Sequence, residues 1–104
     1  MEMIYDGGMS VADAAKALKP IREGIDRVDD AVVRLLGERR SLVLRLAKVK
    51  RGLGLPIHDR KREQALVDRV KKLGRKKRLN EEFVEVVFRL VVMNSKEVQY
   101  HEAG

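Results

Sequence analysis

The sequence predicts an all-α fold of three helices, one long and two of medium length, which pairs with a second copy to form an intertwined helical homodimer. Apolar residues recur at steps of three, four and seven along most of the chain, without the alternation of a strand. Capping and breaking residues divide this pattern into three segments. The first segment is too long to be buried within a chain of 104 residues, so a partner is expected to cover it.

The long helix is expected to run from Pro20 to Arg51. Proline suits the first turn of a helix, and Gly52 and Gly54 follow as stop signals. A helix of about 32 residues is about 48 Å long, so it should pack along a partner. Residues 1–19 are expected to form an N-terminal extension that is partly disordered or a short helix, Val11 to Leu18. The apolar stripe of the long helix consists of Ile21, Ile25, Val28, Val32, Leu35, Leu36, Leu42, Leu46 and Val49.

Two shorter helices are predicted after the connector at residues 55–58. Asp59 is a good N-cap for a helix from Arg60 to Leu73, which Gly74 should close. Asn80 should cap the third helix, which ends near Tyr100. The inward face of this third helix is expected to carry Phe83, Val87, Leu90, Val91 and Asn94.

Composition limits the classes of function. A net charge of +7, with 38% charged residues, indicates an anionic partner. The chain has no cysteine, and its two histidines, His58 and His101, lie far apart, so we expect no metal site. No apolar run approaches the roughly 20 residues of a membrane span, and no signal peptide is apparent. We therefore expect a cytoplasmic protein that does not contact membranes.

Polar residues on the first two predicted helices are spaced so that they share faces. Arg39 and Lys50 are eleven residues apart, which is three helical turns. Asp59, Arg62 and Glu63 fall at positions i, i+3 and i+4, on one side of the second helix. Each of these residues alone is ordinarily part of a solvated surface. Together they can supply cations and a carboxylate to one pocket.

The third predicted helix adds Ser95 and Gln99, an i, i+4 pair. Three packed helices could bring this hydroxyl and this amide to the same pocket as the cations and the carboxylate. Such a pocket suits a small dianion that carries a hydroxyl group.

From Ile21 to Gln99 the chain resembles the all-helical (AroQ-class) chorismate mutases in the order and spacing of several motifs. These are Ile21-Arg22-Glu23-Gly24-Ile25-Asp26-Arg27-Val28-Asp29, Leu35-Leu36-Gly37-Glu38-Arg39-Arg40, Ala47-Lys48-Val49-Lys50, Pro56-Ile57-His58-Asp59 with Arg62-Glu63, and the polar positions Ser95 and Gln99. The resemblance implies a chorismate mutase domain at residues 20–101. It implies the [3,3] rearrangement of chorismate to prephenate, without cofactor or metal.

The resemblance also implies roles for individual residues. Arg39 would bind a carboxylate of the substrate, and Lys50 would contact a carboxylate and the ether oxygen. Gln99 would donate its amide to the same oxygen, so these three residues would be catalytic. Arg22 would bind substrate from the other subunit. Because Arg22 and Arg39 are about 25 Å apart along one helix, they cannot reach one small ligand unless two chains share each active site.

Four further substrate-binding residues follow from the same resemblance. Glu63, with the backbone around Asp59, would receive the ring hydroxyl of chorismate. Arg62 and Ser95 would line the pocket and support the carboxylates.

Two alternatives stay open. An isochorismate pyruvate lyase resembles the same family and shares its cationic pocket, although Glu63 favours the mutase because it suits the ring hydroxyl. A basic helical dimer that binds nucleic acid is the rival from a different class. Its best candidate surface is Lys71-Lys72 with Arg75 to Arg78, but no groove-reading motif accompanies this run. The aromatic content of 4% also argues against stacking on single strands, so no nucleic-acid partner is expected.

Overall fold

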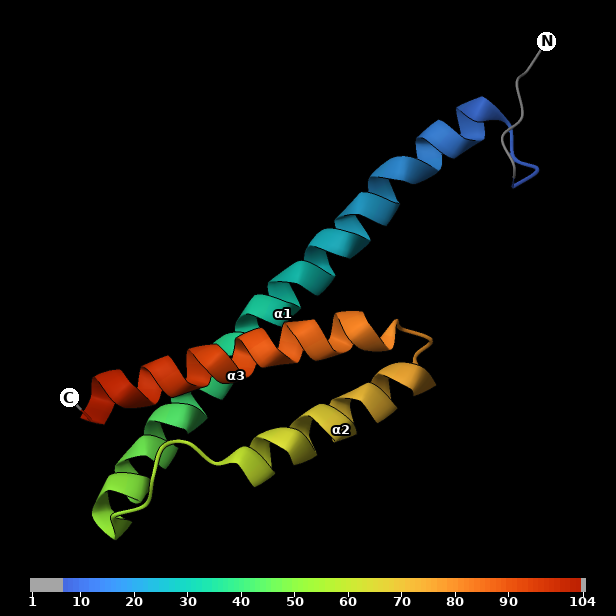
Figure 1. Ribbon diagram of the computed structural model, residues 1–104. Coiled ribbons are helices and arrows are strands. Elements are labelled where there is room, and N and C mark those ends of the chain that lie inside the picture. The colour runs from blue at the N-terminus through green and yellow to red at the C-terminus, as the bar shows by residue number, and fades with distance from the viewer. Residues whose placement is uncertain (1–6, 104) are drawn as a thin grey trace. The chain divides into compact units, whose positions relative to one another are not determined.

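The computed structural model describes residues 7–103 and has the all-α architecture that the sequence predicts. Helix α1 spans Val11–Leu53, α2 spans Arg60–Lys76 and α3 spans Glu81–Ala103 (Figure 1). The chain divides into two compact units at residues 38 and 39, within α1. The second unit contains the end of α1 together with α2 and α3, and it holds the candidate site.

Helix α1 begins earlier than the sequence analysis expects. The Oγ atom of Ser10 accepts a hydrogen bond from the backbone N–H of Asp13 at 3.1 Å, and the helix continues without a break through Pro20. The expected start at Pro20 is therefore wrong. Proline removes one backbone hydrogen bond, but the residues before it, Ala14 to Leu18, have high helix propensity and sustain the helix.

The end of α1 agrees with the predicted stop signal at Gly54. This residue adopts a φ of +68°, which glycine accepts without strain. The N–H of Leu55 donates to the carbonyl of Lys50 at 2.8 Å, and the N–H of Gly54 donates to the carbonyl of Arg51 at 3.3 Å. These two bonds satisfy carbonyls at the helix end and turn the chain into the connector.

Helices α2 and α3 lie side by side and are joined by a short turn at residues 77–80 (Figure 1). Both predicted caps are confirmed. Asp59 Oδ1 accepts from the N–H of Arg62 at 3.0 Å, and Asn80 Oδ1 accepts from the N–H of Phe83 at 2.9 Å. Each cap fixes where its helix begins, and Asp59 thereby also fixes where the first turn of α2 meets the site.

Gly74 does not close α2 as predicted, because the helix continues to Lys76. Gly74 is buried, and a Cβ atom at this position would lie 2.9 Å from Cγ2 of Val84 on α3. The glycine therefore permits the close approach of the two helices. The left-handed position that ends α2 is taken by Arg78, with a φ of +60°.

The inward face of α3 differs from the predicted one. Within the chain, Val84 is buried against Leu66 and Val70 of α2, and Phe88 and Val92 pack against this cluster. The predicted face is largely exposed, with exposed fractions of 61% for Phe83 and 58% for Leu90. Helix α3 carries two apolar stripes, and periodicity does not reveal which of them packs inside one chain.

A second set of apolar side chains is exposed on α1. In the first unit these residues are Ile21, Ile25, Val28, Val32, Leu35 and Leu36, each at least 46% exposed. Isolated exposed apolar residues are ordinary, whereas these six recur at helical spacing along one stretch of α1.

Candidate active site

A cavity of about 320 Å³ lies in the second unit, between the end of α1, the connector, the start of α2 and the second half of α3. Its volume is in the range of small-molecule sites. Seven of the eight predicted site residues line it, namely Arg39, Lys50, Asp59, Arg62, Glu63, Ser95 and Gln99. Apolar side chains such as Leu42, Leu46 and Phe88 complete the wall.

Arg39 is half-buried and donates from Nη1 to the Oγ atom of Ser95. Ser95 is 8% exposed, and its hydroxyl in turn donates to the carbonyl of Val91 at 2.9 Å. Burial, and then the nearby Arg62 guanidinium, lower the pKa of Arg39. An arginine nevertheless keeps its charge at neutral pH, so Arg39 offers the cavity a fixed cation with several donors.

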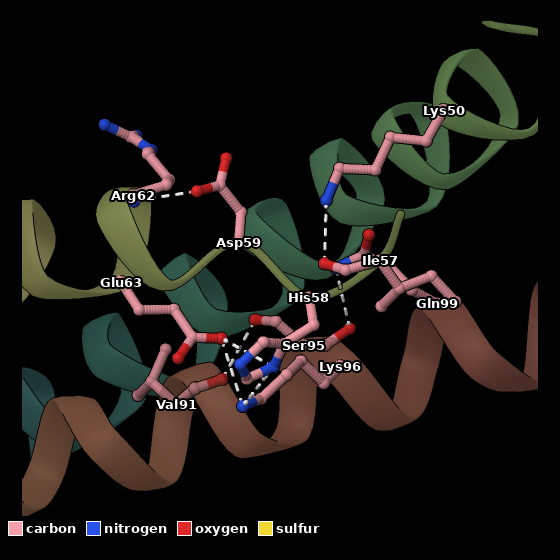
Figure 2. Close-up of polar contacts among 10 residues, drawn as sticks. All are labelled: Lys50, Ile57, His58, Asp59, Arg62, Glu63, Val91, Ser95, Lys96 and Gln99. Carbon is pink, nitrogen blue, oxygen red and sulfur yellow. Dashed lines mark hydrogen bonds and ion pairs between the residues drawn. The ribbon is translucent and has the colours of Figure 1, made fainter. Parts of the chain in front are cut away.

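Lys50 is half-buried and donates from Nζ to the carbonyl of Ile57 at 3.0 Å (Figure 2). This bond ties the connector to the end of α1. An ammonium group has three hydrogens, so the contact with Ile57 leaves others for a ligand.

Gln99 is the most buried polar residue of the site, at 4% exposed. Its Nε2 donates to the carbonyl of Ser95 at 3.3 Å, and its Oε1 has no hydrogen-bond partner among the described residues. Buried amides are nearly always satisfied, and exceptions point to function. One hydrogen of Nε2 also remains for a ligand.

Glu63 lies in the first turn of α2 and is held by a cation that the sequence analysis did not single out. Lys96 Nζ lies 3.0 Å from Glu63 Oε1, and His58 Nδ1 lies 3.7 Å from the same oxygen (Figure 2). Lys96 also lines the cavity. Its position three residues before Gln99 was the available signal, because i and i+3 residues share a helix face.

The two remaining arginines of the predicted set are more exposed. Arg62 lines the cavity, but Figure 2 shows its guanidinium directed away from Glu63 and Ser95. Arg22 lies in the first unit, is exposed, and is not part of the lining.

The described residues contain no group of three or more His, Asp or Glu side chains placed to hold a metal ion. Likewise, no helix within them is long and apolar enough to cross a membrane. The side chains that do gather are cations, two carboxylates, a hydroxyl and an amide. This set can bind a small dianion and stabilise negative charge that develops on it.

Comparison with known proteins gives consistent results. The family model for chorismate mutase type II matches residues 21–100. A chorismate mutase from Methanocaldococcus jannaschii is 34% identical over 82 residues, which cover 79% of this chain and 83% of that protein. The bifunctional chorismate mutase/prephenate dehydratase of Escherichia coli strain K12 is 32% identical over 75% of this chain, which spans only 20% of that longer protein.

A solved structure, a conserved hypothetical protein from Pyrococcus furiosus, is similar with a TM-score of 0.66 and 31% identity, over 80% of this chain and 95% of that one. The family model covers most of the chain, and the archaeal mutase matches over most of its own length. The chain therefore belongs to the type II chorismate mutase family.

Proposed function

We propose that this chain, a chorismate mutase by family, converts chorismate to prephenate in the cavity lined by Arg39, Lys50 and Gln99. The reaction is a step in the biosynthesis of aromatic amino acids. Residues 20–101 form the catalytic domain in this proposal, and residues 1–19 form an extension to it.

The rearrangement needs no nucleophile and no general base, so the protein acts by positioning and by electrostatics. Arg39 binds one carboxylate of chorismate and helps to hold the flexible side chain over the ring, which lowers the entropic part of the barrier. Cleavage of the carbon–oxygen bond runs ahead of carbon–carbon bonding, so negative charge grows on the ether oxygen. Lys50 and Gln99 donate to this oxygen and stabilise the transition state more than the ground state.

The observation that carries this proposal is the buried Gln99 amide, which lines the same cavity as Arg39 and Lys50. A buried neutral donor can contact an ether oxygen without the cost of burying another charge. The remaining residues of the set have supporting roles. Glu63 and the backbone near Asp59 receive the ring hydroxyl, and Arg62 and Ser95 support the carboxylates.

The test compares two lysine variants of α1 by the rate at which chorismate disappears. Lys50→Met should lower kcat/KM by about 100-fold or more, as expected for loss of a charged donor at a developing anion. Lys48→Met is the control, because Lys48 is exposed and does not line the cavity. Equal activity of the two variants would show that Lys50 is not part of the site.

An isochorismate pyruvate lyase is the second candidate, because it would use the same cations. It differs in its product, since a lyase releases pyruvate whereas the mutase retains every carbon. Incubation with isochorismate therefore separates the two activities. The proposal expects no pyruvate.

We further propose that the active unit is a homodimer with shared sites. Two exposed apolar surfaces support it, the α1 stripe from Ile21 to Leu36 and the α3 stripe around Phe83 and Leu90. Arg22 lies on the same stretch of α1 as the first stripe, seventeen residues before Arg39. In a fully overlapping antiparallel pair of helices that span residues 11–53, residue 22 of one helix lies opposite about residue 42 of the other, so Arg22 would complete the partner's site near Arg39.

Mixing two inactive variants tests the shared site. Arg22→Ala and Lys50→Ala homodimers should each be nearly inactive, whereas refolding them together should produce heterodimers as about half of all dimers. One site of each heterodimer carries both lesions and the other carries neither. Activity should recover to roughly a quarter of the wild-type value, because half of the dimers have one intact site. A mixture that forms heterodimers but stays inactive would contradict the proposal.

A further inference from the structure

The cavity contains an ammonium group that the proposed mechanism does not use. Lys96 projects from α3 and is 27% exposed along its side chain, and Glu63, which it contacts, is 25% exposed. Its Nζ lies 3.0 Å from Glu63 Oε1 and 3.4 Å from His58 Nδ1. The ammonium therefore joins three segments of the chain, namely α3, the connector and α2.

We infer that Lys96 is a positioning residue, which holds Glu63 so that the enzyme recognises the ring hydroxyl of its substrate. The inference rests on the proposed function, because it assigns Glu63 to that hydroxyl.

The two carboxylate oxygens of Glu63 have different roles in this arrangement. The ion pair with Lys96 ends on Oε1, as the dashed line between these two residues in Figure 2 shows. Oε2 is thus left to accept a hydrogen bond from a ligand. A glutamate has three side-chain torsions, and fixing one oxygen removes most of its freedom before the substrate binds. A pre-oriented acceptor binds a hydroxyl with a smaller entropic cost.

The second contact of Lys96 fixes the backbone beside Glu63. His58 immediately precedes Asp59, the N-cap of α2. A neutral imidazole whose Nδ1 carries no proton can accept from the ammonium group, which has three hydrogens to donate. One lysine on α3 thereby holds both the residue before the cap and the carboxylate in the first turn. These are the two places that the proposed function assigns to the ring hydroxyl.

An alternative role for Lys96 is direct binding of a substrate carboxylate, as one more cation in the cavity. The two roles differ in which part of the substrate they serve. A positioning role acts on the hydroxyl, whereas a direct ion pair acts on the carboxylates whether or not the hydroxyl is present.

The experiment therefore measures kcat/KM for chorismate and for an analogue in which hydrogen replaces the ring hydroxyl. Lys96→Met removes the charge and retains the length of the side chain. Since the carboxylate is then no longer held in place to accept from the ring hydroxyl, kcat/KM of the variant on chorismate should fall by about tenfold or more. Its loss on the analogue should be much smaller. Lys96→Arg, which keeps a donor, should recover part of the activity on chorismate.

The chain offers a matched control in a second ion pair between α2 and α3. Lys71 Nζ lies 3.0 Å from Glu85 Oε1, and the two side chains are 32% and 29% exposed, close to the values of the Lys96 pair. Lys71 does not line the cavity. Lys71→Met should therefore leave kcat/KM unchanged for both substrates, which shows that loss of an ion pair between these helices is not itself sufficient.

Combining Lys96→Met with Glu63→Gln provides an independent measurement. If Lys96 acts through Glu63, the double variant should be hardly worse on chorismate than Glu63→Gln alone, because coupled residues are not additive. Equal losses on chorismate and on the analogue would overturn the inference, as would additive losses or no loss at all. The activity of the wild-type protein distinguishes the two possible failures. If the wild type does not turn over chorismate, the proposed function is wrong and the inference falls with it. If the wild type is active but the variants behave in one of these ways, only the inference is wrong.

Discussion

Replacing Gln99 with glutamate should make activity depend on the protonation of residue 99, so that the variant is active only in acid. A glutamine amide donates a hydrogen bond at all ordinary pH values, whereas a carboxyl group donates only while it is protonated. The two side chains have nearly the same size, so the variant fits a position that is 4% exposed in the wild-type chain. The substitution therefore changes the chemistry of the donor and little else.

The size of the effect follows from the burial of this side chain and from its place in the mechanism. Removal of one donor to a developing oxygen anion typically lowers kcat by about 100- to 1000-fold, which corresponds to about 2.7–4 kcal/mol. Gln99→Glu should lose at least this much at high pH, because the ionised carboxylate also repels the oxygen. As the pH falls and the carboxyl group gains its proton, the donor returns and activity should recover.

The assay is a profile of kcat/KM against pH for three proteins. The wild-type enzyme sets the intrinsic pH dependence, and Gln99→Met, which has no donor at any pH, sets the level of activity without a donor. Gln99→Glu should approach the wild-type value in acid and fall to or below the Gln99→Met value in base. A Gln99→Glu profile parallel to that of the wild type would refute the reasoning, since it would mean that residue 99 does not contact the ether oxygen.

Three further predictions concern stability, charge and metal dependence. Gly74→Ala should be less stable than Gly52→Ala by about 1–3 kcal/mol in chemical denaturation. The added Cβ at residue 74 would lie 2.9 Å from Cγ2 of the stiff Val84 side chain, whereas nothing lies within 4 Å of one added at Gly52. Equal stabilities would disprove this contact. Hydrogen bonding from Arg89, followed by that from Lys71, lowers the pKa of Glu85, so Arg89→Ala should raise this pKa in an NMR titration. The stabilisation of the fold by ionised Glu85 should be lost as pH falls through the pKa of the folded state. An unchanged pKa in the variant would contradict the assignment. Exhaustive chelation and dialysis should leave chorismate turnover intact, and activity that returns only with a divalent ion would overturn the mechanism.

Local signals predicted much of the fold correctly. Asp59 and Asn80 were recognisable as N-caps because a short polar side chain there can satisfy a free backbone N–H, and both hydrogen bonds are present. The predicted helix start at Pro20 was wrong because the effect of a proline depends on the helix propensity of the residues around it. The predicted helix end at Gly74 was wrong for a different reason. In the sequence alone, a glycine that ends a helix cannot be told from one that permits close packing against a neighbouring helix.

The candidate site was predictable as a set of residues, and its internal contacts were not. Helical spacing and the family resemblance identified Arg39, Lys50 and Gln99, which line one cavity. The contact between Lys96 and Glu63 joins residues 33 positions apart on different helices. No periodicity within a single helix encodes such a pairing, because it depends on how α2 and α3 pack.

The most direct test of the account is to identify what the purified protein makes from chorismate. Wild-type protein should convert chorismate completely to prephenate, seen by NMR of the unfractionated reaction, with no second product and no added cofactor. Lys50→Met, at the same protein concentration, should form prephenate at a rate lower by about 100-fold or more. Release of pyruvate, or prephenate formation no faster than in buffer alone, would contradict the claim that this cavity is a chorismate mutase site.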